Sequence, residues 1–182
     1  MSLNARIALA AAIALLLAPL WLPAVPWLLA WRRRQVLRGR ELGYAWLDAR
    51  QAATIAAHAE ATMPPLPSGD WAKVAHNVDR YLAGVQSPRR WRIGALLTLL
   101  EFAPLLRRAE PLSRMPVDVR REFLERHMAT TRGMLAIPAL ARQLVRMGYY
   151  TDAEVAARLG FLTMSQRLRR APEAAVAGRL VG

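Results

Sequence analysis

RRWRIGALLTLLEFAPLLRR, residues 89–108, is the stretch that decides the fold of this chain. Its apolar side chains are spaced to cover almost the whole circumference of a helix, which is typical of a helix with neighbours on every side. They are Trp91, Ile93, Leu96, Leu97, Leu99, Leu100, Phe102 and Leu105. We therefore expect this stretch to be the central helix of a bundle, bent at Pro104 because proline removes a backbone donor.

Helical spacing continues upstream of this stretch. It predicts one helix over about residues 44–63 and a second over about residues 71–83. The loop between them, MPPLPSGD, contains three prolines and a glycine, which end the first helix. Ser68 or Asp70 in this loop is expected to cap the second helix.

Downstream, Pro116 stands where a first helical turn tolerates proline, and VDVRREFLERHM continues the helix after it. A further helix is expected over about residues 134–150. The last one is short: Thr151 and Glu154 are spaced as a capping box that opens it, and Gly160 ends it.

No stretch alternates apolar and polar residues in the way a half-buried strand does, so we expect no sheet. The predicted fold is all-α, with an N-terminal transmembrane helix followed by a compact bundle of about five to six helices. We divide the chain into a membrane anchor with an arginine cluster (residues 1–40), a helical domain (residues 41–162) and a basic, flexible tail (residues 163–182).

Residues 7–31, IALAAAIALLLAPLWLPAVPWLLAW, contain no charged side chain. At a helical rise of about 1.5 Å per residue, they are long enough to cross the hydrocarbon core of a bilayer. Tryptophans gather at the end of the run, as they do at a membrane–water interface, and arginines follow at once. The residues expected to set membrane position and topology are Trp21, Trp27, Trp31, Arg32, Arg33, Arg34, Arg38 and Arg40.

Positive charge is retained preferentially on the cytoplasmic side of a membrane. The arginines therefore predict a single-pass protein of the cell (inner) membrane with most of its chain in the cytoplasm. Periplasmic placement is the alternative, and a cleaved secretory signal with MSLNAR as its charged region is another. The length of the apolar run, the missing small-x-small cleavage site and the arginines beyond it favour the anchor.

The chain of 182 residues has a net charge of +13 and a pI near 11.6. This excess of arginine favours an anionic partner, either lipid or nucleic acid. A membrane-tethered regulatory protein that binds nucleic acid or anionic lipid is therefore an alternative function. Basic positions do not interleave with aromatic ones, however, so we expect no nucleic acid as a partner. The chain has no cysteine, which excludes disulfides, thiolate zinc sites and iron–sulfur clusters.

Residues that could perform chemistry are few. His58, His76 and His127 do not stand at a metal-ligand spacing, and we expect them at the surface. No glycine pair forms a nucleotide-binding loop, and no serine lies in a nucleophile motif. We expect no catalytic residue, no cofactor-binding residue and no metal ligand in this chain. A stand-alone hydrolase that works through arginines and carboxylates is the alternative.

The carboxylates of the helical domain are flanked by arginines at helical spacing. They are Glu101, Asp118, Glu122 and Glu125. Asp118 with Arg121, and Glu122 with Arg126, are predicted ion pairs on an exposed helix face.

Five segments carry a resemblance to a known family. They are LDARQAATIAAHAEATMPPLPSGD (47–70), VDRYLAG (78–84), ALLTLLEFAPLL (95–106), LSRMPVDVRREFLERHM (112–128) and MGYYTDAEVAARLGF (147–161). In this order they resemble the small-subunit family (gamma, subunit 3) of membrane-bound gluconate 2-dehydrogenases. The resemblance covers about residues 47–162, and its most specific block is the last one.

The resemblance implies a non-catalytic accessory subunit that binds, stabilises and positions a larger flavin-dependent enzyme of the GMC (glucose–methanol–choline) type. That partner would oxidise an alcohol, sugar or sterol with FAD and pass electrons to a cytochrome or a quinone. The residues expected to contact it are Arg120, Arg121, Tyr149, Tyr150, Asp152 and Glu154, because the densest resemblance lies around them.

The chain departs from the family pattern at two places. Many relatives carry a twin-arginine signal for export, whereas this chain has an apolar run with arginines behind it. The usual closing Gly-Tyr-Pro is Gly160-Phe161-Leu162, which lacks the tyrosine hydroxyl. The first departure favours a flavoprotein held on the cytoplasmic face of the membrane.

Overall fold

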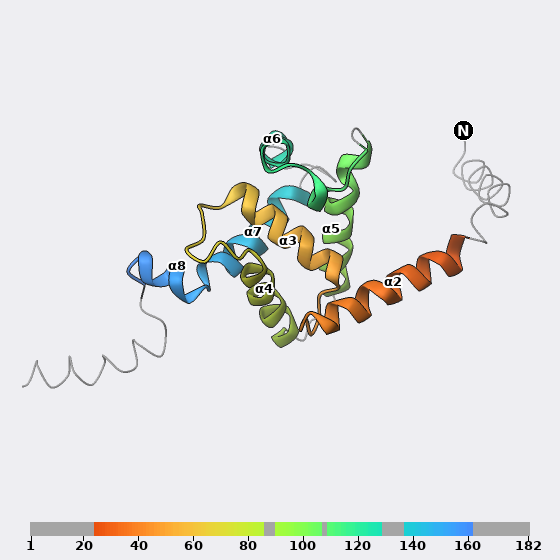
Figure 1. Ribbon diagram of the computed structural model, residues 1–182, viewed down its shortest axis with the longest axis horizontal. Helices are drawn as coiled ribbons and strands as arrows, with labels where there is room; N and C mark the ends of the chain where they lie inside the picture. The colour runs from red at the N-terminus through yellow and green to blue at the C-terminus, as the bar shows by residue number, and fades with distance from the viewer. Residues whose placement is uncertain (1–23, 86–89, 107–108, 129–136, 162–182) are drawn as a thin grey trace, which may run out of the picture.

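The computed structural model describes residues 24–85, 90–106, 109–128 and 137–161. Over these ranges it contains seven α-helices and two short 3-10 helices, and no strand (Figure 1). The prediction of an all-α fold is confirmed for this part of the chain.

The α-helices are α2 (Ala24–Glu41), α3 (Ala49–Thr62), α4 (Ala72–Gly84), α5 (Arg90–Phe102), α6 (Val117–Met128), α7 (Ile137–Tyr150) and α8 (Ala153–Arg158). The 3-10 helices are η1 (Ala103–Leu106) and η2 (Leu112–Arg114).

The central helix of the bundle is α3, which packs against α2, α4, α5, α6, α7 and η2. Its buried positions are mostly alanines, and such short side chains let other helices approach from several directions. Helix α5 lies to one side of the bundle (Figure 1). Its side chains Trp91 and Leu99 are exposed. The expectation that the apolar stretch 89–108 forms the centre was wrong, because small residues rather than large ones allow contact on every side.

The structure differs from the prediction at the end of α5 and at the start of α8. The α-helical part of α5 ends at Phe102 and continues as the 3-10 turn η1, where Pro104 cannot donate a helical hydrogen bond. Helix α8 is capped by Asp152, whose carboxylate accepts from the backbone of Glu154 and Val155. Thr151 donates to the Met147 carbonyl at 2.6 Å, so the predicted capping box is replaced by an aspartate cap.

Helices α4 and α7 approach closely at Gly148. A Cβ atom at this position would stand 2.6 Å from Val78 Cγ2 and 2.7 Å from the Val74 carbonyl oxygen. A side chain would therefore force the two helices apart. The Asn77 amide also donates to the Gly148 carbonyl at 3.0 Å, which fixes the register of this pair.

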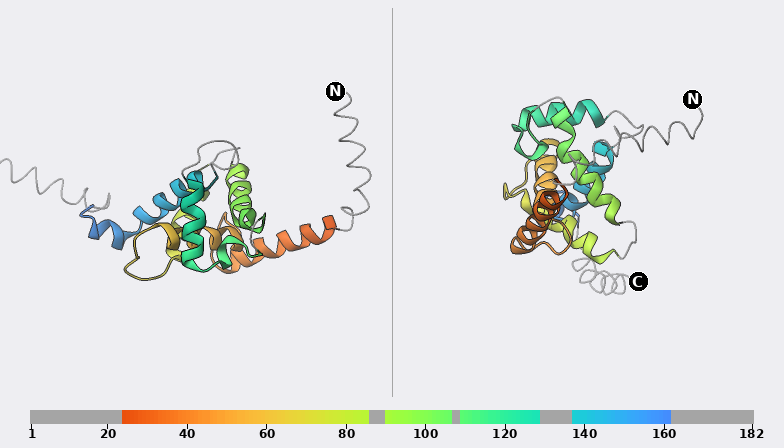
Figure 2. Two further views of the ribbon diagram at one scale, coloured as in Figure 1. Left: turned by 90° about the horizontal axis from the view of Figure 1, so that it is seen from above. Right: turned by 90° about the vertical axis from the view of Figure 1, so that its right-hand side faces the viewer.

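Helix α2 leaves the bundle as an arm, and α8 lies at the opposite end of the long axis (Figures 1 and 2). The arm contains the last part of the predicted membrane segment; residues 7–23 of that segment lie outside the described residues. Among the helices in the described ranges, none has the length and hydropathy that crossing a bilayer requires.

Candidate functional site

The predicted partner-contacting residues divide between two places. Tyr149, Tyr150, Asp152 and Glu154 lie together where α7 meets α8. Arg120 and Arg121 lie on α6, which packs against α3 and α7 on another side of the bundle (Figure 1). The six residues therefore do not form one surface.

Arg120 is a buried structural residue, with 5% of its surface exposed. Its guanidinium donates to the carbonyls of Leu112 (3.1 Å), Ala57 (2.9 Å) and Met115 (2.7 Å), and to the Glu60 carboxylate (2.8 Å). These bonds join α6 to α3 and η2, so the side chain is not available to a partner. Arg121, its neighbour, is exposed and donates to the Ala61 carbonyl at 3.0 Å.

At the α7–α8 end, Tyr149 is buried in the core, and burial raises the pKa of its hydroxyl. Asp152 is buried as the α8 cap. Tyr150 is 51% exposed and meets Tyr149 edge to face, with ring centroids 5.3 Å apart. Glu154 is exposed and pairs with Lys73 at 3.2 Å. Tyr150 and Glu154 are thus the two predicted contact residues that present a surface here.

The predicted topology residues lie on α2, except Trp21, which lies outside the described residues. Trp27 and the five arginines are exposed. Trp31 is half-buried and packs on the bundle: its ring lies 6.3 Å from the Phe102 ring, and the Arg50 guanidinium lies 5.2 Å above it. Trp31 therefore attaches the arm to α3 and α5.

Helix α2 ends in a Schellman motif, which turns the chain sharply into the bundle. Gly43 has φ +84°, a left-handed conformation that favours glycine, and its N–H donates to the Arg40 carbonyl. The next residue, Tyr44, donates to the Gly39 carbonyl. A Cβ on Gly39 would stand 2.8 Å from the Leu47 carbonyl oxygen, so α2 passes directly against the following connector.

The connector, residues 44–48, is held by one carboxylate. Asp79 of α4 accepts from the backbone N–H groups of Ala45 (2.8 Å), Trp46 (2.8 Å) and Leu47 (2.7 Å). This binding replaces the predicted helix over residues 44–48, and α3 begins only after Asp48, which forms a capping box with Gln51. Asp79 therefore fixes the path between the arm and the bundle.

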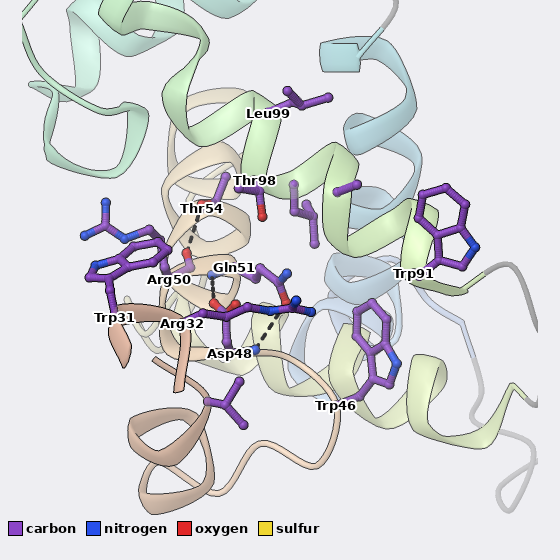
Figure 3. Close-up of a pocket in the computed structure, with 13 residues that line it drawn as sticks. Trp31, Arg32, Trp46, Asp48, Arg50, Gln51, Thr54, Trp91, Thr98 and Leu99 are labelled. Carbon is purple, nitrogen blue, oxygen red and sulfur yellow. Dashed lines mark hydrogen bonds between the residues drawn. The ribbon is translucent and has the colours of Figure 1, made fainter. Parts of the chain in front are cut away.

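A groove of about 870 Å³ opens between α2, the connector, the start of α3 and α5 (Figure 3). Three tryptophans and several aliphatic side chains form its apolar lining, and two arginines and an aspartate its charged lining. The lining residues are Trp31, Arg32, Val36, Trp46, Asp48, Arg50, Gln51, Thr54, Trp91, Ala95, Leu97, Thr98 and Leu99. Spacing within each helix did not predict this groove, because its walls come from segments far apart in the chain.

Glu101 lies behind the groove and is fully buried. Its carboxylate accepts from the Thr54 hydroxyl (3.0 Å) and from the backbone (3.1 Å) and hydroxyl (2.6 Å) of Ser113, and it lies 3.7 Å from the Arg50 guanidinium. The only sequence signal for the burial of Glu101 is its place as a single carboxylate inside an apolar helix. The ion pairs Asp118–Arg121 (3.8 Å) and Glu122–Arg126 (2.6 Å) are confirmed.

Of the three histidines, His58 was wrongly expected at the surface. It is fully buried on α3, within 3.4 Å of the Pro138 carbonyl and 3.2 Å of the Thr62 hydroxyl. Burial lowers the pKa of His58 to about 4, and the charges of Arg142 and Arg120 act in the same direction. Because alanines surround it on α3, periodicity alone gave no sign of its burial.

The low pKa of His58 predicts a loss of stability in mild acid. The unfolded chain binds a proton near pH 6.5 and the folded one near pH 4, so stability falls as the pH drops through this window. We expect wild type to lose roughly 2 to 3 kcal/mol more between about pH 7 and pH 4.5 than His58→Gln does. Urea unfolding at both pH values measures this difference, and His127→Gln is the control. Equal losses in wild type and His58→Gln would contradict the assignment.

Within the described residues, no group of three or more histidine and carboxylate side chains is arranged to hold a metal ion. Comparison of the chain with protein-family models, curated proteins and solved structures finds no match. The resemblance to dehydrogenase small subunits therefore rests on its motifs.

Proposed function

We propose that this chain is a membrane-anchored accessory subunit that binds, stabilises and positions a flavin-dependent dehydrogenase of the GMC type. The chain itself carries no cofactor in this proposal; the partner carries FAD, oxidises an alcohol, sugar or sterol, and passes electrons to a cytochrome or a quinone. The anchor in this proposal is the apolar run of residues 7–31, whose last part lies in α2, and the arginines after it hold the bundle on the cytoplasmic side of the inner membrane.

The observation that carries the proposal is the arrangement of two unlike surfaces at opposite ends of the bundle. At one end, α2 projects with exposed apolar residues such as Trp27 and Leu29, followed by its arginines. At the other end, Tyr150, Leu159 and Phe161 are each about half exposed around α8. Figure 1 shows the two ends separated by the whole bundle, so a partner at α8 would not compete with the membrane at α2.

The firm attachment of the arm also supports this role. A positioning subunit must transmit the orientation of its anchor to the bound enzyme. Here the Schellman turn fixes the direction in which the chain leaves α2, the Asp79 carboxylate holds the connector, and the Trp31–Arg50 contact joins α2 to α3. A flexible tether would need none of these contacts.

The motifs that carry the resemblance coincide with contacts that hold the bundle together. Asp79 binds the connector, Glu101 binds Ser113, Arg120 joins α6 to α3, and Asp152 caps α8. Such residues specify a fold more than a binding surface. The choice of a flavin-dependent partner follows from the resemblance.

The test is isolation of the tagged chain from native membranes in mild detergent, with mass identification and a visible absorbance spectrum of the bound material. We expect a larger protein with the absorbance of a flavin. Tyr150→Ala should lower the amount of that partner at least about fivefold, since exposed aromatic anchors dominate interfaces. Tyr81→Ala, a similarly exposed tyrosine on α4, is the matched control. A colourless chain without a flavoprotein would reject the proposal.

A further inference from the structure

The groove between α2 and α5 has an apolar wall that nothing in the described part of the chain covers. Trp91 is 65% exposed and Leu99 46% exposed, and both line the groove with Trp31 and Trp46. Figure 3 shows Trp46 and Trp91 at one side of the groove and Trp31 at the other. Exposed apolar walls of this kind mark a surface that meets a ligand, a protein or a membrane.

Arg32 supplies a positively charged side chain to the same groove. It has neither a hydrogen-bond nor an ion-pair partner among the described residues, and Figure 3 shows its side chain crossing the middle of the groove. Arg50, the second arginine of the lining, is already engaged, because it lies 3.7 Å from Glu101 and stacks on Trp31 and Phe102. Asp48 is engaged as the cap of α3. Arg32 is therefore the arginine of the lining whose guanidinium is available to a ligand.

The position of the groove along α2 indicates where its occupant comes from; this step rests on the proposed membrane anchoring. Trp31 is the last residue of the apolar run and Arg32 follows it directly, where tryptophans and arginines lie at the level of lipid headgroups. Val36, the last α2 residue of the lining, is only about 6 Å further along the helix. The mouth of the groove would thus open within the headgroup layer, which is roughly 5 to 8 Å deep on each side of the hydrocarbon core.

We propose that this groove binds one anionic phospholipid of the surrounding bilayer. The Arg32 guanidinium contacts the phosphate, as arginine does with phosphate oxygens elsewhere. The glycerol and the upper part of an acyl chain lie against Trp46, Trp91 and Leu99, which accounts for the exposure of Trp91 and Leu99 in the chain alone. Because the walls of the groove come from α2, α3 and α5, a lipid bound in it would hold the arm against the bundle.

The test titrates the full chain, delipidated in mild non-ionic detergent, with palmitoyl-oleoyl phosphatidylglycerol or phosphatidylcholine, and counts bound lipid by native mass spectrometry. We expect one tightly held phosphatidylglycerol and weaker binding of the zwitterionic lipid. Arg32→Gln should weaken phosphatidylglycerol binding about tenfold, the equivalent of one charge-assisted contact. Arg34→Gln removes the same charge two residues away, from a side chain that does not line the groove. It should weaken the binding of phosphatidylglycerol less than about threefold.

Two further measurements distinguish a bound lipid from a soluble phosphate compound. Trp91→Ala should weaken the binding of phosphatidylglycerol, and soluble glycerol phosphate should compete poorly, because the apolar wall contributes only with an acyl chain. Equal effects of Arg32→Gln and Arg34→Gln, or equal affinity for glycerol phosphate, would overturn the proposal. Membrane sedimentation after an alkaline wash of the same variants tests the anchor separately, since the detergent titration does not depend on it.

Discussion

Replacing Arg120 with methionine should lower the free energy of unfolding by about 3 to 5 kcal/mol. Methionine preserves much of the volume of the side chain, so the loss comes from hydrogen bonds rather than from a cavity. Four acceptors on α3, η2 and the segment after it lose a charged donor at once, at distances of 2.7 to 3.1 Å. Each such bond to a charged group contributes about 1.5 to 3 kcal/mol. The net loss stays below the sum of the four, because the substitution also removes the cost of burying the charged guanidinium.

Arg121 provides the matched control for this substitution, because it is the next residue of the same helix. It is exposed, donates one bond to the Ala61 carbonyl and makes a loose pair with Asp118. Arg121→Met should therefore cost less than about 1 kcal/mol. Urea unfolding of the full chain in mild detergent, followed by far-ultraviolet circular dichroism, measures both variants. If they were equally stable, Arg120 would not be the structural residue described here.

Replacing Asp79 with alanine should cost about 3 kcal/mol and loosen the connector between arm and bundle. Three backbone N–H groups lose their common acceptor, and an unsatisfied buried donor costs about 1 to 3 kcal/mol. Because Ala45 is exposed, water can accept from its N–H group in the variant. The total cost is therefore lower than that of three unsatisfied buried donors. We also expect chymotrypsin to cut after Tyr44 or Trp46, because the N–H groups of the next residues, Ala45 and Leu47, bind the carboxylate in the wild type.

Two further variants sharpen this prediction. Asp79→Asn keeps an oxygen for Trp46 and Leu47 but not for Ala45, so it should be intermediate in both stability and cleavage. Asp70→Ala removes an exposed carboxylate that accepts one backbone N–H, from Ala72, and should cost about 1 kcal/mol without exposing the connector. Cleavage at the connector in Asp70→Ala but not in Asp79→Ala would contradict the role given to Asp79.

The helices themselves were predictable from local signals. The prolines and glycine of MPPLPSGD, the proline before Val117 and the left-handed Gly160 mark ends that the structure reproduces within a few residues. Local signals are enough at these ends, because each of them depends on residues within one or two turns. The ion pairs of α6 were predictable for the same reason, since their partners are three or four residues apart.

The buried polar residues were not predictable, because their partners lie far along the chain. Asp79 binds a segment more than 30 residues before it, and Arg120 reaches α3 across about 60 residues. The centre of the bundle was missed for a related reason. The hydrophobicity of a helix indicates how much apolar surface it buries. How closely other helices approach it is decided by small residues, such as the alanines of α3 and Gly148 of α7. The groove combines both difficulties, since Arg32, Trp46 and Trp91 belong to three separate segments.

The central claim is that this chain positions a flavoprotein at the membrane, and one measurement tests it most directly. Membranes and cytosol are prepared from native cells with and without this chain, and the flavin-dependent alcohol or sugar dehydrogenase activity of each fraction is assayed with an artificial electron acceptor. The account predicts that the membrane-bound activity disappears without the chain and returns when the full chain is restored. Membrane-bound activity that is unchanged in its absence would contradict the account.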